Sequence, residues 1–131
     1  MMKKGILFSF TLLLLFCLNV NYAYSEEINK ARVDNLLRQQ WEGLKRALKQ
    51  KDIEGALKYF SERTKSQHRQ IFDALKEQLP AIMDTFVEFN IIRISGNTAE
   101  YEIVAKENGR LYSYPGNLVK DEDGIWRFYD F

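Results

Sequence analysis

Residues 41–60 read W-E-G-L-K-R-A-L-K-Q-K-D-I-E-G-A-L-K-Y-F and join the end of a long amphipathic helix to a short second helix. In the first helix, apolar residues recur at helical spacing, with charged residues between them. The apolar positions are Val33, Leu36, Leu37, Trp41, Leu44, Ala47 and Leu48. Asp52 is the predicted N-cap of the second helix, because its carboxylate can accept from the free amides of the next turn. We therefore expect a long helix from Ala31, then a turn, then a short helix.

A third helix is predicted from residue 64, because T-K-S-Q at residues 64–67 matches the capping-box pattern. Its expected buried stripe comprises Ile71, Phe72, Leu75 and Leu79. Pro80 disrupts this pattern, and residues 81–85 fit either one more helical turn or a connector. Gly43 in the first helix fits a close approach of another element or simple tolerance on an exposed side.

From residue 86 the sequence has the properties of strands. Residues 86–94 are β-branched and aromatic, and residues 99–105 alternate apolar with polar. Asn108-Gly109 predicts a type I′ hairpin, whose central residues both need positive φ. The next strand contains Pro115, which implies an edge position or a bulge, and a final strand is expected at residues 125–131. The expected fold class is α+β, with helices on one face of an antiparallel sheet of about four strands.

Three features of the chain resemble one known family. They are the long first helix, the A-L-x-x-x-D-x-x-x-A-L-x-Y-F turn at residues 47–60 and the D-G-x-W-R hairpin at residues 123–127. Together they look like the nuclear-transport-factor-2-like superfamily, with its cystatin-like α+β cone. The resemblance implies three N-terminal helices packed on a curved sheet, with a pocket at the open end, in an exported bacterial member. This family includes isomerases, dehydratases, hydrolases and proteins that only bind or assemble, so the fold does not imply an activity.

Residues 1–25 have the layout of a secretory signal peptide, in which lysines precede an apolar run and small residues fit cleavage between Ser25 and Glu26. A retained membrane anchor is the alternative, but the apolar run is shorter than the roughly 20 residues that a span needs. A lipid-modified Cys17 is disfavoured because bulky residues precede it. We expect export to the periplasm or medium, with residues 26–131 as a single domain.

Charge and composition exclude several classes of partner and cofactor. The net charge of the chain is +1, and the sequence contains no block of like charge. We therefore expect no binding to nucleic acid or, after signal cleavage, to a membrane. With one histidine and with its one cysteine inside the signal segment, the domain is expected to hold no disulfide, metal or cofactor. The D-E-D-G segment at residues 121–124 lacks the other ligand positions of a calcium loop and is predicted to be a solvated hairpin.

The expected binding pocket lies between the first helix and the sheet, and aromatic side chains are its candidate lining. The candidates are Trp41, Phe60, His68, Tyr101, Tyr112, Tyr114 and Trp126. Core packing is the ordinary role of such aromatic residues. Tyrosines that point inward would also offer hydroxyl groups in an apolar pocket, as small-ligand sites do.

The function predicted first is binding of a small apolar ligand or of a protein partner, by an exported domain with no assigned catalytic residue. The first alternative is an isomerase-like or hydrolase-like pocket enzyme. It requires His68, or an aspartate such as Asp84, to converge with a tyrosine hydroxyl inside the cone. The second alternative is a structural homodimer formed through the sheet.

Overall fold

The computed structural model describes residues 2–131, with side chains from Cys17 onward. The chain divides into two compact units, Met1–Val33 and Asp34–Phe131, and helix α1 (Met2–Lys49) contains the described part of the first unit. Within the described residues, no helix is long and apolar enough to span a membrane. The signal-peptide prediction concerns residues 1–25, of which the side chains of residues 1–16 lie outside those described, and it stays a prediction.

Helix α1 already includes residues 26–30, so the predicted helix start at Ala31 is wrong. None of the five residues E-E-I-N-K is a helix breaker. Glu26 and Lys30 also form an i,i+4 ion pair of 3.9 Å within the first unit.

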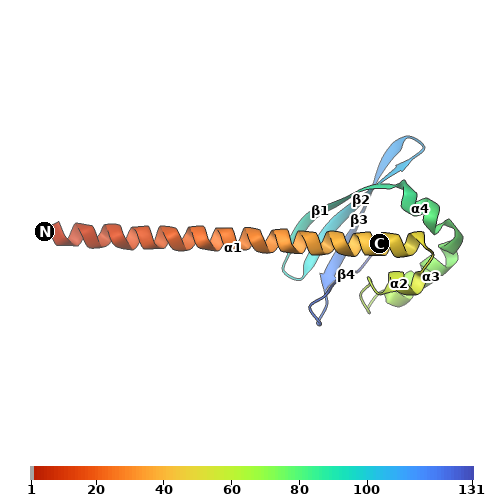
Figure 1. The fold of residues 1–131 in the computed structure, drawn as a ribbon, viewed down its shortest axis with the longest axis horizontal. Helices are drawn as coiled ribbons and strands as arrows, with labels where there is room; N and C mark the ends of the chain where they lie inside the picture. Colours follow the sequence, from red (N-terminus) through yellow and green to blue (C-terminus); the bar gives the residue numbers. More distant parts are fainter. Residues whose placement is uncertain (1) are drawn as a thin grey trace. The chain divides into compact units, whose positions relative to one another are not determined.

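The second unit combines the end of α1 with three further α-helices, one 3₁₀ helix and one sheet (Figure 1). These elements are α2 (Ile53–Leu57), α3 (Lys65–Leu75), η1 (Lys76–Gln78), α4 (Leu79–Thr85), β1 (Phe86–Ser95), β2 (Thr98–Glu107), β3 (Arg110–Lys120) and β4 (Trp126–Phe128). The strands pair antiparallel in the order β1-β2-β3-β4. The predicted α+β fold, with helices followed by an antiparallel sheet of four strands, is confirmed.

The caps of the two short connecting helices differ from one another. Asp52 caps α2 as predicted, since its Oδ1 accepts from the Gly55 amide at 2.9 Å. Helix α3 begins at Lys65 as predicted, but the capping box is wrong, because Thr64 makes no side-chain bond to the helix. Its hydroxyl is turned toward the preceding turn and donates to the Ser61 carbonyl at 3.5 Å.

Residues 81–85, left open by the sequence, belong to helix α4, which begins at Leu79 and has Pro80 in its first turn, where a missing N–H costs nothing. The buried stripe predicted for the third helix is only half correct. Phe72 and Leu79 are buried, whereas Ile71 and Leu75 are 41% and 38% exposed. Both exposed residues line a cavity between the helices and the sheet, which nothing in the described chain fills.

The sheet is built as the strand periodicity predicts. Asn108 and Gly109 have φ values of 51° and 77° and form the tight turn between β2 and β3. Strand β3 pairs with β2 in unbroken register through Pro115, while β4 pairs only with residues 118–120. Pro115 therefore lies where β3 is an open edge, so the predicted edge position is confirmed.

Strand β4 ends at Phe128, three residues before the predicted end of the final strand. The Tyr129 amide still donates to the Asn117 carbonyl at 2.9 Å. After it, the Asp130 carboxylate accepts from the Asn117 backbone amide, which ends the ladder. The chain then crosses the core, and Phe131 packs against the rings of Phe60, Phe72, Trp41 and Phe86.

Both edges of the sheet carry features that hinder pairing with another strand. On β3, Pro115 lacks an N–H, and Asp130 occupies the amide of Asn117. On β1, the register shifts at two places, and Arg38 Nη1 donates to the Phe89 carbonyl at 2.9 Å. The homodimer through the sheet stays a prediction, and these features restrict where its strands could pair.

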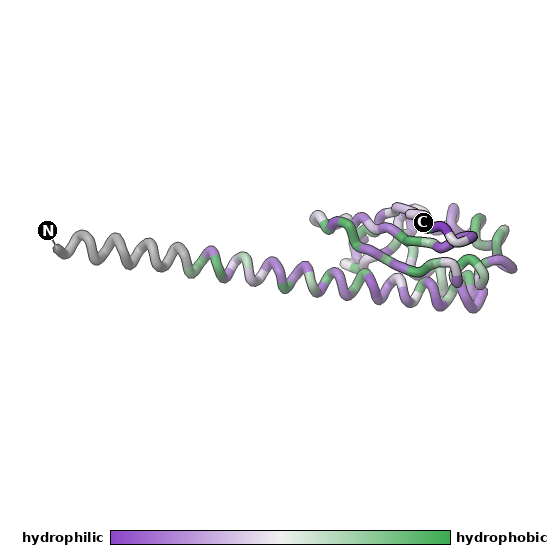
Figure 2. The backbone as a smooth tube through the Cα atoms, turned by 90° about the horizontal axis from the view of Figure 1, so that it is seen from above, coloured by the Kyte–Doolittle hydropathy of each residue, from purple (hydrophilic) through white to green (hydrophobic). Residues whose placement is uncertain are grey.

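The core lies between the end of α1, the short helices and one face of the sheet. Figure 2 shows apolar and polar residues alternating along the strands and along α1, as expected when only one face is buried. The largest fully buried side chains are Tyr101, Phe60, Phe72, Phe128, Leu37, Leu44, Leu48, Leu57, Leu79 and Leu118.

Candidate functional site

An apolar cavity of about 420 Å³ lies between α3, α4 and the face of the sheet that carries the helices. The helical side is lined by Ile71, Phe72, Leu75, Leu79, Ile82 and Met83. The sheet side is lined by Phe86, Tyr101, Ile103, Glu107, Tyr114 and Pro115, and Phe131 completes the lining. Its volume falls within the roughly 300–1,000 Å³ of small-molecule sites.

Ile71 and Leu75, which line this cavity, are both partly exposed. Both side chains belong to α3, on which the neighbouring Phe72 is 1% exposed. Neighbouring apolar residues left partly exposed around a hollow mark an interaction surface more often than scattered exposed residues do. The cavity is therefore the strongest candidate for a binding site in the described chain.

Two polar side chains meet at the sheet side of the cavity. Tyr114 Oη donates to Glu107 Oε1 at 3.0 Å. This hydrogen bond, more than any other influence, raises the pKa of the Tyr114 hydroxyl above its ordinary value. Glu107 is half-buried and is the one charged residue in the described lining of the cavity.

Tyr101 also lines the cavity, but its hydroxyl is committed elsewhere. Tyr101 is 2% exposed, and its Oη donates to the Asp130 carbonyl at 2.7 Å. Burial raises the pKa of this hydroxyl far above its ordinary value, so it stays protonated at neutral pH. Tyr101 therefore anchors the segment after β4 and contributes its ring, rather than a reactive hydroxyl, to the cavity.

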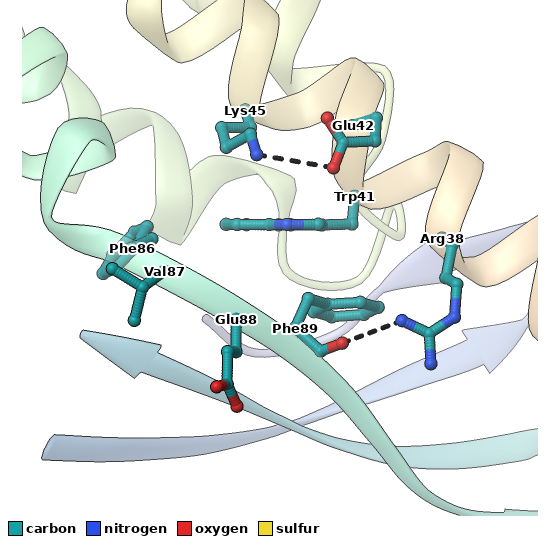
Figure 3. Close-up of a pocket in the computed structure, with 8 residues that line it drawn as sticks. All are labelled: Arg38, Trp41, Glu42, Lys45, Phe86, Val87, Glu88 and Phe89. Carbon is teal, nitrogen blue, oxygen red and sulfur yellow. Dashed lines mark hydrogen bonds and ion pairs between the residues drawn. The ribbon is translucent and has the colours of Figure 1, made fainter. Parts of the chain in front are cut away.

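Trp41 lies outside this cavity, in a separate groove of about 160 Å³ between α1 and β1 (Figure 3). Its indole stacks on Phe89, with ring centroids 5.3 Å apart and planes 13° apart. The Lys45 ammonium lies 5.6 Å from the indole centroid on the other side, close enough for a cation–π contact. Trp41 thus packs the end of α1 against β1.

The other aromatic candidates do not line the cavity either. Phe60 and Trp126 are buried in the core, and the Trp126 carbonyl accepts from Gln40 Nε2 at 2.6 Å. Tyr112 is exposed; it pairs in register with Ala105, so it shares the cavity's face of the sheet but lies outside the described lining. Of the seven candidates, the structure brings Tyr101 and Tyr114 together at this cavity.

His68 is buried beside the cavity rather than in it. It is 3% exposed, its ring centroid lies 4.2 Å from that of Phe60, and Nδ1 lies 2.8 Å from the Thr64 carbonyl oxygen. A carbonyl oxygen only accepts, so Nδ1 carries the proton in this contact. Burial lowers the pKa of the imidazole, outweighing the opposing effects of the Thr64 bond and of Asp130.

This depressed pKa predicts a pH dependence of stability. The unfolded chain takes up a proton on His68 first as the pH falls, because the folded-state pKa lies below the ordinary value of 6.5. We expect the free energy of unfolding to decrease as the pH falls from about 8 to about 5, with the loss beginning near the ordinary pKa. Urea unfolding across this range should show a smaller decrease for His68→Gln. An unchanged pH dependence in the variant would contradict this role of His68.

Asp84, the other predicted acid or base, lies on the surface. Its Oδ1 forms an ion pair of 2.9 Å with Lys49 Nζ, and both side chains are largely exposed. His68 and Asp84 therefore each bind another partner, and neither is hydrogen-bonded to a tyrosine hydroxyl of the cavity. Among the described residues, no group of three or more histidine, cysteine or carboxylate side chains is placed to hold a metal ion.

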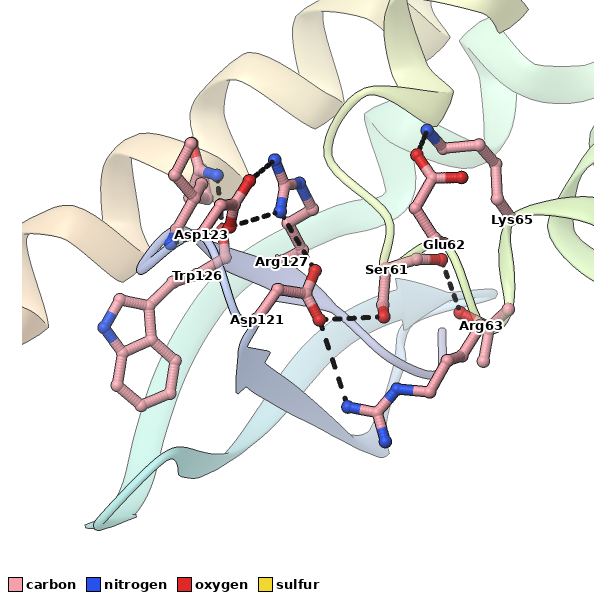
Figure 4. Close-up of polar contacts among 11 residues, drawn as sticks. Ser61, Glu62, Arg63, Lys65, Asp121, Asp123, Trp126 and Arg127 are labelled. Carbon is pink, nitrogen blue, oxygen red and sulfur yellow. Dashed lines mark hydrogen bonds and ion pairs between the residues drawn. The ribbon is translucent and has the colours of Figure 1, made fainter.

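The D-E-D-G hairpin is largely exposed, as predicted, and its side chains also form a structural junction (Figure 4). Arg127 donates to Asp123 at 2.8 and 2.9 Å and to Asp121 at 3.0 Å. Asp121 also accepts from Ser61 Oγ at 3.0 Å, which ties the loop before α3 to the turn before β4. The Arg127 guanidinium lowers the pKa of Asp123, as expected for a bidentate pair.

A scan against protein-family models finds no match for this sequence, and a search of curated proteins finds none either. Among solved structures, the chain is similar to the crystal structure of an NTF-2 like protein of unknown function from Shewanella oneidensis MR-1. The two are 12% identical, the alignment covers 73% of this chain and 93% of that chain, and the TM-score is 0.44. The similarity concerns the fold.

Several residues of the cavity were not among the candidates drawn from the sequence. Glu107 could have been found, because it continues the alternation of Tyr101, Ile103 and Ala105 and so lies on the same face of β2. Ile71 and Leu75 were placed on the correct helix face but were expected to be covered. Phe131 gave no signal, since its position depends on the chain leaving the sheet after β4.

Proposed function

We propose that this chain binds a small apolar molecule in the cavity between α3, α4 and the sheet, as a binding domain rather than an enzyme. The observation that carries the proposal is the cavity of about 420 Å³, lined almost entirely by apolar side chains. Ile71 and Leu75 on α3 remain partly exposed there, which a bound apolar molecule would relieve.

The expected affinity follows from the apolar surface that a ligand could bury. At about 25 cal/mol per Å², burial of about 300 Å² contributes about 7.5 kcal/mol before the ligand's lost freedom is subtracted. That loss amounts to at least about 4 kcal/mol. The remainder corresponds to a Kd near or above the millimolar range unless polar contacts add to it. The cavity alone therefore supports a weak site for general apolar ligands.

We propose no catalysis because the candidate acids and bases are hydrogen-bonded or ion-paired to other groups of the chain. His68 donates to the Thr64 carbonyl, Asp84 pairs with Lys49, and the Tyr101 hydroxyl donates to the Asp130 carbonyl. General acid–base catalysis needs such a group within hydrogen-bond reach of the substrate. None of these three contacts leaves its group directed into the cavity. Glu107 and Tyr114 do line the cavity and are hydrogen-bonded to each other, and the proposal assigns this pair to ligand binding.

A cavity-filling substitution tests the proposal. Leu75→Trp places an indole in the cavity from a position that is already 38% exposed, so it is expected to fold and to lower ligand affinity about tenfold or more. The measurement is titration of the 131-residue chain with the neutral apolar fluorophore N-phenylnaphthylamine, followed by the emission of the probe.

Leu111→Trp is the matched control for this experiment. Leu111 is also an exposed leucine, but it lies on β3 outside the lining of the cavity, so the same substitution should leave probe binding unchanged. The proposal fails if the unmodified chain does not bind the probe. It also fails if Leu75→Trp and Leu111→Trp reduce binding equally.

A further inference from the structure

We infer that the ligand of this cavity carries a protonated amino group, and that Glu107 binds this group while the apolar part of the ligand enters the cavity. The inference rests on the proposed function, because it assigns the class of molecule that the same cavity takes. It depends on three observations within the described chain: Glu107 lies at the edge of the cavity, one of its carboxylate oxygens makes no hydrogen bond, and no lysine or arginine pairs with it.

Glu107 is placed at the boundary between the apolar lining and solvent. It is the last residue of β2, beside the turn at Asn108 and Gly109, and it lies on the same face of the strand as Ile103. It is half-buried, so its charge is less screened than that of a fully exposed residue. A ligand seated in the cavity would therefore bring its polar end near this carboxylate.

The carboxylate is also oriented and only partly used. Tyr114 Oη donates to Oε1 at 3.0 Å, which orients the side chain, and Oε2 makes no hydrogen bond or ion pair within the described chain. A protonated amine has donors only and matches a carboxylate oxygen that can accept. The adjacent Tyr114 ring adds a face on which a cation can rest.

Within the described chain, no lysine or arginine forms an ion pair with Glu107. Arg110 pairs with Glu107 in the register of β2 and β3, but it is exposed and forms no ion pair with it. Other carboxylates of the sheet do have a partner, as Glu100 does in its 2.7 Å pair with Arg93. The Glu107 carboxylate would repel an anionic ligand. A neutral alcohol could donate a hydrogen bond to it, but without the added attraction between opposite charges that a protonated amine provides.

The test compares three ligands that share an alkyl chain and differ in the head group: octylamine, octanol and nonanoate. Isothermal titration of the full chain at neutral pH is expected to show octylamine binding about tenfold more tightly than octanol, and nonanoate most weakly. Glu107→Gln should remove the preference for octylamine and leave the affinity for octanol unchanged, which also shows that the variant is folded.

Glu100→Gln serves as the matched control, because it removes a carboxylate from the same strand on the opposite face. It should leave the preference for octylamine intact. Equal affinity for octylamine and octanol, or a preference that survives Glu107→Gln, would overturn this inference while leaving the proposed function in place. If none of the three ligands binds, the proposed function itself fails, and the inference fails with it.

Discussion

Phe128→Ala is expected to lower the free energy of unfolding by about 3–5 kcal/mol, the largest effect predicted for a single substitution in this chain. Phe128 is 0% exposed, and its ring lies within 6.4 Å, centroid to centroid, of five other aromatic rings. These rings belong to Trp41, Phe60, Phe89, Tyr101 and Phe131. Removal of the ring would leave a void at the centre of this cluster.

The backbone around Phe128 is fixed on both sides, which limits how far the void can close. Its amide donates to the Tyr59 carbonyl at 2.8 Å, and its carbonyl accepts from the Ser61 amide at 2.9 Å. On the other side it pairs with Leu118 of β3. Since the cost of a large-to-small substitution grows with the volume that stays empty, the expected loss lies toward the upper part of the range.

Phe131→Ala provides the comparison for this prediction. Phe131 also contacts Trp41 and Phe60 but is 38% exposed, so its truncation should cost about 1–2 kcal/mol, as expected for a side chain that is only partly buried. Urea unfolding followed by circular dichroism gives both values. A loss for Phe128→Ala no greater than that for Phe131→Ala would show that the junction at Phe128 does not control stability.

The order of helices and strands could be predicted because local chemistry and the fold agree with each other. Asp52 can cap only a helix that begins after it, and Asn108-Gly109 favours one type of turn. The alternation of Tyr101 and its neighbours defines a buried face of β2. These signals depend on residues close together in the sequence, so they can be read without knowledge of the tertiary structure.

The candidate site was harder to predict because it depends on distances between elements. Helical spacing placed Ile71 and Leu75 on the face of α3 that points inward, but spacing does not say whether the sheet is near enough to cover them. Likewise, Trp41 and Phe60 are aromatic residues on inward faces. Here Trp41 stacks on Phe89 of β1 and Phe60 packs against Phe128 of β4, so both side chains are buried in the core and neither lines the cavity.

The network around Arg127 shows the same limit in a polar setting. The sequence identifies residues 121–124 as a turn, and the structure confirms that turn. Asp121 also accepts from Ser61, which is 60 residues away in the sequence. A turn motif carries no information about such a distant partner, so its role in joining the helical and sheet layers becomes visible only in the fold.

Gly116→Ala is expected to lower the free energy of unfolding by about 2–3 kcal/mol, because a buried ring occupies the place of a side chain at this position. Gly116 pairs with Tyr101 across β2 and β3, and an added Cβ would lie 2.7 Å from Cε1 of the Tyr101 ring. The ring cannot easily move, since it packs against Phe89 and Phe128 and its hydroxyl donates to the Asp130 carbonyl.

Gly43→Ala is the matched control, because a tyrosine ring covers this glycine too. An added Cβ at Gly43 would also lie 2.7 Å from Cε1, here of Tyr59, but Tyr59 is only half-buried and can turn toward solvent. Alanine also gains about 1 kcal/mol over glycine inside a helix. Gly43→Ala is therefore expected to change stability by no more than about 1 kcal/mol in either direction.

A double-mutant cycle identifies the cause of the loss at Gly116. If the ring is responsible, Gly116→Ala should cost much less in a Tyr101→Leu background, with a coupling free energy of about 1–2 kcal/mol. Urea unfolding of the two single variants and the double variant supplies the cycle. Additive effects would place the cost in the backbone of β3 instead, although Gly116, unlike Gly109, does not adopt the positive φ that strains other residues.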